Sequence, residues 1–211
     1  MRKTKEEAEA TREKILNAGL KVFSKKGYVS TTLDDIAREA GVTRGAVYWH
    51  FKNGKPELFE VLINERSRGA QEIATAVVAE GGTPLQTLER ILIRLMEYLE
   101  EDDDFRAVQE LTILRTEVVP ELEDSMKEKF RLQRASIDSF ADLIRLGQQA
   151  GEIRPDIDPE IGAITAIGLM NGVIVMWMMD HSLFSIKAYA RPVVQAYLKG
   201  LVPADRKKSK V

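Results

Sequence analysis

Residues 48–51, Tyr-Trp-His-Phe, put three aromatic rings and a histidine in four consecutive positions. A helix turns by about 100° per residue, so four neighbours cannot all face one core. Val47 and Phe51 are one turn apart and would together form the buried face. That leaves three side chains for water or a partner: Tyr48, Trp49 and His50.

The residues just before these rings have the chemistry of a DNA contact. Thr43 would present its hydroxyl, and the helix N-terminus its amide donors, to a phosphate. Arg44 can reach O6 and N7 of guanine, and Gly45 lets the backbone approach a duplex closely. Although the net charge is −2, the first 60 residues hold 12 Lys and Arg against 9 Asp and Glu. The basic excess therefore lies around this segment.

Two short helices, about 33–40 and 44–51, are predicted around a tight turn at Gly41. Thr32 would cap the first and Thr43 the second. This spacing is typical of a helix-turn-helix motif. A longer helix should precede it, ending at Gly27, and a fourth should begin near Pro56 and run into the 70s.

The break Gly81-Gly82-Thr83-Pro84 predicts a second bundle, with helices at about 84–101, 104–118, 121–150 and 159–180 and a last one ending at Gly200. We therefore expect an all-α protein of about nine helices. The predicted domains are 1–55 (helix-turn-helix DNA-binding domain), 56–80 (linking helix) and 81–211 (helical bundle).

Catalysis and metal binding are not expected. The chain has no cysteine, which excludes thiolate zinc sites and thiol chemistry. Its two histidines, His50 and His181, are far apart in sequence, and there is no glycine-rich phosphate loop. We therefore predict no cofactor and no metal. The first twenty residues lack an apolar run, so no signal peptide is expected.

Residues 161–179 contain no charged side chain and are long enough to be a candidate membrane span. Gly168 and Gly172 also form the GxxxG pair common in membrane helices. However, the segment contains Thr165 and Asn171, and neither flank is basic. A helix buried inside a bundle and a dimer interface explains the same apolarity, so we expect no membrane association.

The stretch TTLDDIAREAGVTRGAVYWHFKNGKPELF resembles the N-terminal domain of the tetracycline-repressor (TetR) family of bacterial transcription regulators, with similarity over residues 11–63. The resemblance implies a cytoplasmic regulator whose third helix enters the major groove of double-stranded operator DNA. It assigns DNA contacts to Thr32, Thr43, Arg44, Gly45, Tyr48, Trp49, His50 and Lys55. Three alternatives remain open: Thr32 as a helix cap only, Tyr48 packing on the first helix, and Trp49 covering a helix end.

Gly54 is the one departure from the family pattern, which usually reads Phe-Lys-Asn-Lys at this point. The glycine intervenes between Asn53 and Lys55. We expect it to loosen the link to the fourth helix, and it leaves the phosphate contact of Lys55 open.

The segments RAVQELTILRTEVVPELEDSMKEKFRLQR and GEIRPDIDPEIGA are similar to the subgroup of the family that represses multidrug-efflux genes. This similarity implies a pocket for a hydrophobic small-molecule effector, lined by Leu92, Leu95, Met96, Gln109, Ile113, Phe140, Met170, Asn171, Ile174 and Trp177. It also implies a homodimer that pairs through Ile161, Thr165, Gly168, Gly172, Val193, Tyr197 and Leu201.

A two-fold dimer would hold two recognition helices about 34–36 Å apart and bind a palindromic operator. The sequence thus predicts a ligand-responsive repressor of an efflux or detoxification operon. The main alternative is a DNA-binding adaptor or architectural protein whose second domain binds protein partners and no small molecule. An enzyme with an N-terminal regulatory domain is a weaker third hypothesis.

Overall fold

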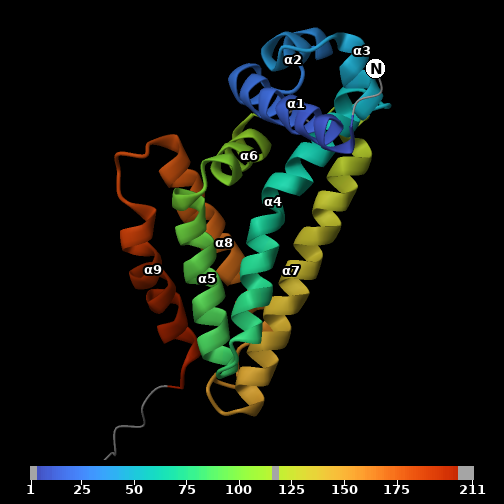
Figure 1. Ribbon diagram of the computed structural model, residues 1–211. Coiled ribbons are helices and arrows are strands. Elements are labelled where there is room, and N and C mark those ends of the chain that lie inside the picture. Colours follow the sequence, from blue (N-terminus) through green and yellow to red (C-terminus); the bar gives the residue numbers. More distant parts are fainter. Residues whose placement is uncertain (1–3, 116–118, 204–211) are drawn as a thin grey trace, which may run out of the picture. The chain divides into compact units, whose positions relative to one another are not determined.

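The computed structural model describes residues 4–115 and 119–203, and within these ranges the chain forms nine α-helices, one 3-10 turn and no strand (Figure 1). The all-α prediction is confirmed. The end of the helix expected over 104–118 and the last residues of the chain lie outside the described ranges. The elements are α1 (Lys5–Lys26), α2 (Leu33–Ala40), α3 (Arg44–His50), α4 (Lys55–Ala79), α5 (Pro84–Glu101), α6 (Asp103–Leu114), η1 (Pro120–Leu122), α7 (Glu123–Gln149), α8 (Pro159–Met179) and α9 (Ile186–Leu201).

The chain divides into two compact units. Unit 1 consists of Met1–Gly69 and Asp102–Glu128, and unit 2 consists of Ala70–Glu101 and Lys129–Val211. Helix α6 therefore groups with α1 to α3, whereas the sequence placed it in the second domain. The physical reason is burial, because Val108 and Leu111 on α6 pack into the core of unit 1.

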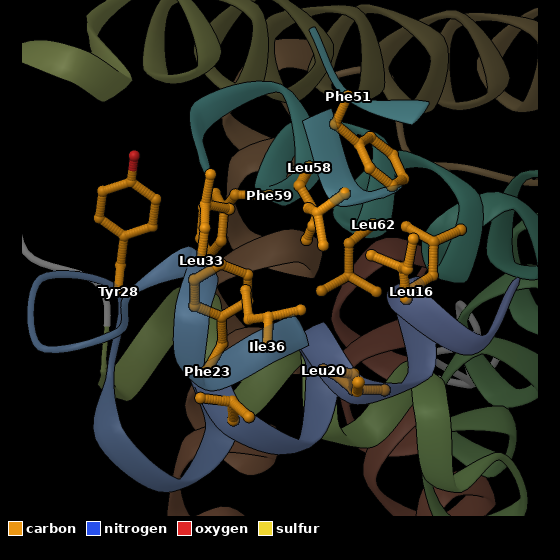
Figure 2. Close-up of a cluster of buried hydrophobic side chains, with 14 of the residues drawn as sticks. Leu16, Leu20, Phe23, Tyr28, Leu33, Ile36, Phe51, Leu58, Phe59 and Leu62 are labelled. Atoms are coloured by element: carbon orange, nitrogen blue, oxygen red, sulfur yellow. The ribbon is translucent and has the colours of Figure 1, made fainter. Parts of the chain in front are cut away.

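An aromatic cluster forms the centre of unit 1 (Figure 2). Phe23 stacks on Tyr28 with ring centroids 5.8 Å apart, and Phe59 meets both rings edge-on at 5.1 and 4.7 Å. Figure 2 shows Leu16, Leu20, Ile36 and Leu62 packed beside these rings, with the hydroxyl of Tyr28 directed away from them. Helices α1, α2 and α4 thus share one core.

The short helices of unit 1 begin and end where the sequence predicts. Thr32 and Asp35 form a capping box at the start of α2, in which each side chain accepts a backbone N–H of the other residue. A hydrogen bond from Lys26, together with those from Thr32, lowers the pKa of Asp35 to about 2. Gly41 then ends α2 in the left-handed conformation, with φ 66°.

Helix α8 is long and apolar enough to cross a membrane by length and composition alone, which is weak evidence for a single helix, and 39% of that window is buried in the protein. It packs against α5 and α9 inside unit 2. Gly162 allows a close approach, because a Cβ there would lie 2.8 Å from the side chain of Ile144. Helix α8 therefore packs as one member of the helical bundle of unit 2.

Replacing Phe23 by alanine should lower the free energy of unfolding of unit 1 by about 3–5 kcal/mol, because it leaves a cavity among buried rings. Val29→Ala is the control, because half of the Val29 side chain is exposed and the loss should stay within about 0.5 kcal/mol. Urea denaturation followed by circular dichroism measures both. Equal losses in the two variants would contradict this account of the core.

Candidate functional site

Helix α3 divides its side chains between core and surface as the helical wheel predicts. Val47 and Phe51 are buried, whereas Tyr48 is 41% and Trp49 is 66% exposed. Thr43 caps the helix by accepting the N–H of Ala46. The predicted partition is therefore confirmed for Phe51, Tyr48 and Trp49, whereas His50 is half-buried.

Arg44 is held in place on that surface by two neighbours. Its Nη1 donates to a carboxylate oxygen of Asp34 at 3.0 Å, and its Nη2 donates to the hydroxyl of Tyr48 at 3.4 Å. The guanidinium also lies 5.6 Å from the centre of the Tyr48 ring. The hydrogen bond to Tyr48 and the charge of Asp34 raise the pKa of Arg44, so it stays cationic.

The positions next to Arg44 are open. A Cβ on Gly45 would have only the Thr43 hydroxyl near it, at 3.9 Å. The Trp49 ring meets the His50 ring edge-on, with centroids 4.5 Å apart. Thr32, by contrast, uses its hydroxyl in the capping box with Asp35. Thr32 thus has a structural role of its own.

Lys55, the first residue of α4, is anchored on Tyr28. Its Nζ donates to the Tyr28 carbonyl at 3.2 Å and lies 4.2 Å from the centre of the Tyr28 ring. The Tyr28 hydroxyl in turn donates to the carboxylate of Glu121 at 3.1 Å. Burial and this hydrogen bond raise the pKa of Tyr28. A lysine has three N–H donors, and the bond to Tyr28 uses one.

The turn at Gly54 is closed, which corrects the expectation of a loosened link. Gly54 is buried with φ 72°. Its N–H donates to the Phe51 carbonyl at 3.0 Å, and its own carbonyl accepts the N–H of Leu58 at 3.1 Å. A Cβ at this position would lie 3.5 Å from Leu33 and from the Tyr48 ring. The extra residue is thus built into the packing of α2, α3 and α4.

Unit 2 contains a small apolar cavity between α5, α8 and α9. It is lined by Leu92, Met96, Ala166, Leu169, Met170, Val193, Val194 and Tyr197 and has room for about one water molecule. Three of these residues were predicted to bind an effector and two to form a dimer. The Tyr197 hydroxyl donates to the Gly162 carbonyl at 2.7 Å, and burial raises its pKa to about 12.

The other predicted effector residues do not line this cavity. Phe140, Ile174 and Trp177 are buried elsewhere in unit 2, Leu95 is half-buried and Asn171 is exposed. Trp177 lies against His181, with ring centroids 4.3 Å apart. Gln109 and Ile113 lie on α6, which belongs to unit 1.

The predicted dimer residues of α8 share one exposed face. Ile161, Thr165, Gly168 and Gly172 follow one another at three- to four-residue spacing, and all are exposed. On α9 the outcome is mixed. Val193 and Tyr197 are half-buried, and Leu201 is buried within its own unit. The exposed face of α9 also carries three small residues at four-residue spacing, Ala188, Pro192 and Ala196.

A capped recognition helix with an exposed arginine and aromatic rings, joined to a second helical unit, defines a helix-turn-helix DNA-binding protein. Two protein-family models match the chain. The model described as "Bacterial regulatory proteins, tetR family" matches residues 15–62, and the model described as "MAATS-type transcriptional repressor, C-terminal region" matches residues 83–203. The chain therefore belongs to the TetR family of bacterial transcription regulators. It is a regulator of transcription and not an enzyme.

Relatives resemble the chain over nearly its whole length. The HTH-type transcriptional regulator AcrR of Shigella flexneri is 33% identical, with 94% of this chain and 92% of AcrR covered. The crystal structure of NalD, the secondary repressor of the MexAB-OprM multidrug efflux pump in Pseudomonas aeruginosa, matches with a TM-score of 0.83 and 28% identity, covering 94% and 98%. SmeT, from Stenotrophomonas maltophilia, matches in its complex with triclosan with a TM-score of 0.78 and 28% identity, covering 93% of each chain.

Substituting Arg44 and Lys55 should separate base reading from phosphate contact. Arg44→Ala should lose about 1–3 kcal/mol of discrimination at one base position. Lys55→Ala should weaken binding to all sequences alike. It should also reduce by about 1 the slope with which the logarithm of the binding constant falls as the logarithm of the salt concentration rises. Fluorescence anisotropy over a salt series, on a duplex that the wild type selects from a random library, measures both. Identical effects in the two variants would refute these roles.

Proposed function

We propose that the chain is a homodimeric, cytoplasmic repressor of an efflux or detoxification operon. A hydrophobic small molecule would release it from a palindromic operator. Helix α3 and the N-terminus of α4 would contact DNA, and unit 2 would bind the effector and the second subunit. Within the predicted domains, residues 1–55 would bind the operator and residues 56–80 would form the helix that links the two domains. Residues 81–211 would bind the effector and form the dimer.

The observation that carries this proposal is that similarity to efflux-pump repressors extends over both units. NalD and SmeT are each named as repressors of multidrug efflux pumps, and each matches more than nine-tenths of this chain, at 28% and 27% identity respectively. Since SmeT forms a complex with triclosan, a hydrophobic aromatic compound is the class of ligand best supported for this chain as well.

The apolar cavity is the proposed starting point of the effector site. Leu92, Met96 and Met170 contribute flexible or aliphatic side chains, and methionine adapts to ligands of varied shape. Because the cavity holds only about one water molecule, a drug-sized ligand must bind a state in which these helices have separated. A ligand shifts the equilibrium only by its differential affinity for the two states.

Two features support the proposal that ligand binding at this cavity alters the dimer interface and the DNA contacts. Val193 and Tyr197 line it from α9, so its opening would alter a helix assigned to the dimer interface. Helix α4 is continuous from Lys55 in unit 1 to Ala79 in unit 2. A displacement of α4 would therefore move Lys55, which is proposed to contact a phosphate.

Triclosan, hydrophobic antimicrobials and flavonoids should raise the melting temperature of the protein and weaken its binding to the selected operator duplex. Met170→Trp should overfill the cavity and raise at least tenfold the ligand concentration needed for either effect, because the indole occupies space that the ligand needs. Met176→Trp is the matched control on the same helix, since Met176 is exposed and does not line the cavity.

Thermal-shift and anisotropy titrations measure these two effects. If no compound stabilises the protein and operator binding is insensitive to all of them, the adaptor hypothesis is favoured instead. Equal losses in Met170→Trp and Met176→Trp would argue against the cavity as the site.

Thr165→Arg should convert the dimer to a monomer and abolish operator binding. Thr165 is exposed on the apolar face of α8, so a two-fold interface there would bury two like charges without partners. Thr75→Arg, at an exposed threonine of α4, should remain dimeric. Sedimentation velocity at micromolar concentration measures both, and a monomeric wild type would refute the dimer.

A further inference from the structure

Asp34 and Asp35 are adjacent acids in the first turn of α2 but have different partners. The Asp35 carboxylate accepts from Thr32, in the cap of its own helix, and pairs with Lys26 at 2.9 Å. The Asp34 carboxylate instead pairs with Arg44 on α3, ten residues further along the chain. Asp35 thus fixes the start of α2. Asp34 instead contacts Arg44, which the family resemblance predicts to contact a DNA base.

The pair between Asp34 and Arg44 contributes little to the stability of the fold. Both side chains are more than half exposed, and ion pairs in water are weak because solvent screens them. Removing Asp34 should therefore leave the protein folded. An acid in the first turn also interacts favourably with the dipole of α2, but this effect does not require its contact with Arg44 on another helix.

We propose that Asp34 determines operator specificity by positioning Arg44, an inference that rests on the proposed DNA-binding function. Arginine has a long, flexible side chain, and ordering it on binding is costly. Asp34 holds Nη1 and Tyr48 holds Nη2 before DNA arrives, which fixes the plane of the guanidinium. The remaining N–H donors of the five are left to reach the base.

The same carboxylate also weakens binding to DNA of any sequence, because it brings a negative charge close to the phosphates. Asp34 therefore has two effects of opposite sign. It raises the affinity for sequences that Arg44 can read and lowers the affinity for all others. Both effects widen the ratio between operator and unrelated DNA, which is the quantity that matters on a chromosome.

The test uses the full-length protein and the duplex that the wild type selects from a random library, together with every single-base variant of that duplex. Asp34→Ala should lower base discrimination at the position read by Arg44 about three- to tenfold, the effect of losing one immobilised side chain. Its affinity for an unrelated duplex should rise about twofold or more. Anisotropy titrations at constant salt measure both.

Glu39→Ala is the matched control. Glu39 lies on the same helix and pairs with a lysine, Lys21, so the substitution removes the same charge without touching Arg44. It should leave base discrimination unchanged. Asp34→Asn keeps an acceptor oxygen but no charge, and its discrimination should fall between those of the wild type and Asp34→Ala.

A double-variant cycle separates positioning from a general loss of structure. In an Arg44→Ala background, Asp34→Ala should have no further effect on base discrimination. Unchanged or increased discrimination in Asp34→Ala, with normal selection by the wild type, would overturn the role of Asp34 alone. A wild type that selects no sequence would overturn the DNA-binding function itself.

Discussion

The proposed DNA-contact surface depends on the burial of Val47 and Phe51. Helix α3 has only seven residues, and a helix this short is unstable in isolation. Its conformation is therefore maintained by two side chains, both almost fully buried in the core of unit 1. With those anchors in place, the helical period turns Trp49 to the opposite side of the helix and Tyr48 to a flank, where both rings are exposed.

Tyr28 extends this constraint from the core to α4. Its ring packs on Phe23 and Phe59 in the aromatic cluster, while its carbonyl and ring face hold Lys55. Its hydroxyl donates to Glu121, in the 3-10 turn that precedes α7. One buried tyrosine thus joins the core, a proposed phosphate contact and a segment far along the chain, so changes in any of these should be felt by the others.

Local signals predicted most of the fold, and long-range packing accounts for what they missed. The caps Thr32 and Thr43, the turn at Gly41 and the exposure of the α3 rings each depend on residues within one or two helical turns. The closed turn at Gly54, by contrast, is supported by Leu33 and Tyr48 from two other helices. Periodicity shows that a face is apolar but not which core will bury it, which is why the grouping of α6 with α1 and the burial of Leu201 could not be foreseen.

The two units meet opposite physical requirements. If Arg44 reads a base, as we propose, unit 1 must be rigid so that Arg44 arrives in a fixed orientation, and aromatic rings and closed turns provide that rigidity. A sensor must instead have a second state within a few kcal/mol of the first. The cavity in unit 2 suits that need, because Met96, Met170 and Leu92 can repack at low cost. On the outer face of α8, Gly168 and Gly172 have no side chain to obstruct a second helix. A repressor needs tight packing around the helix that contacts DNA and adaptable packing around the ligand. With both, ligand binding in one unit can change the other unit without unfolding either.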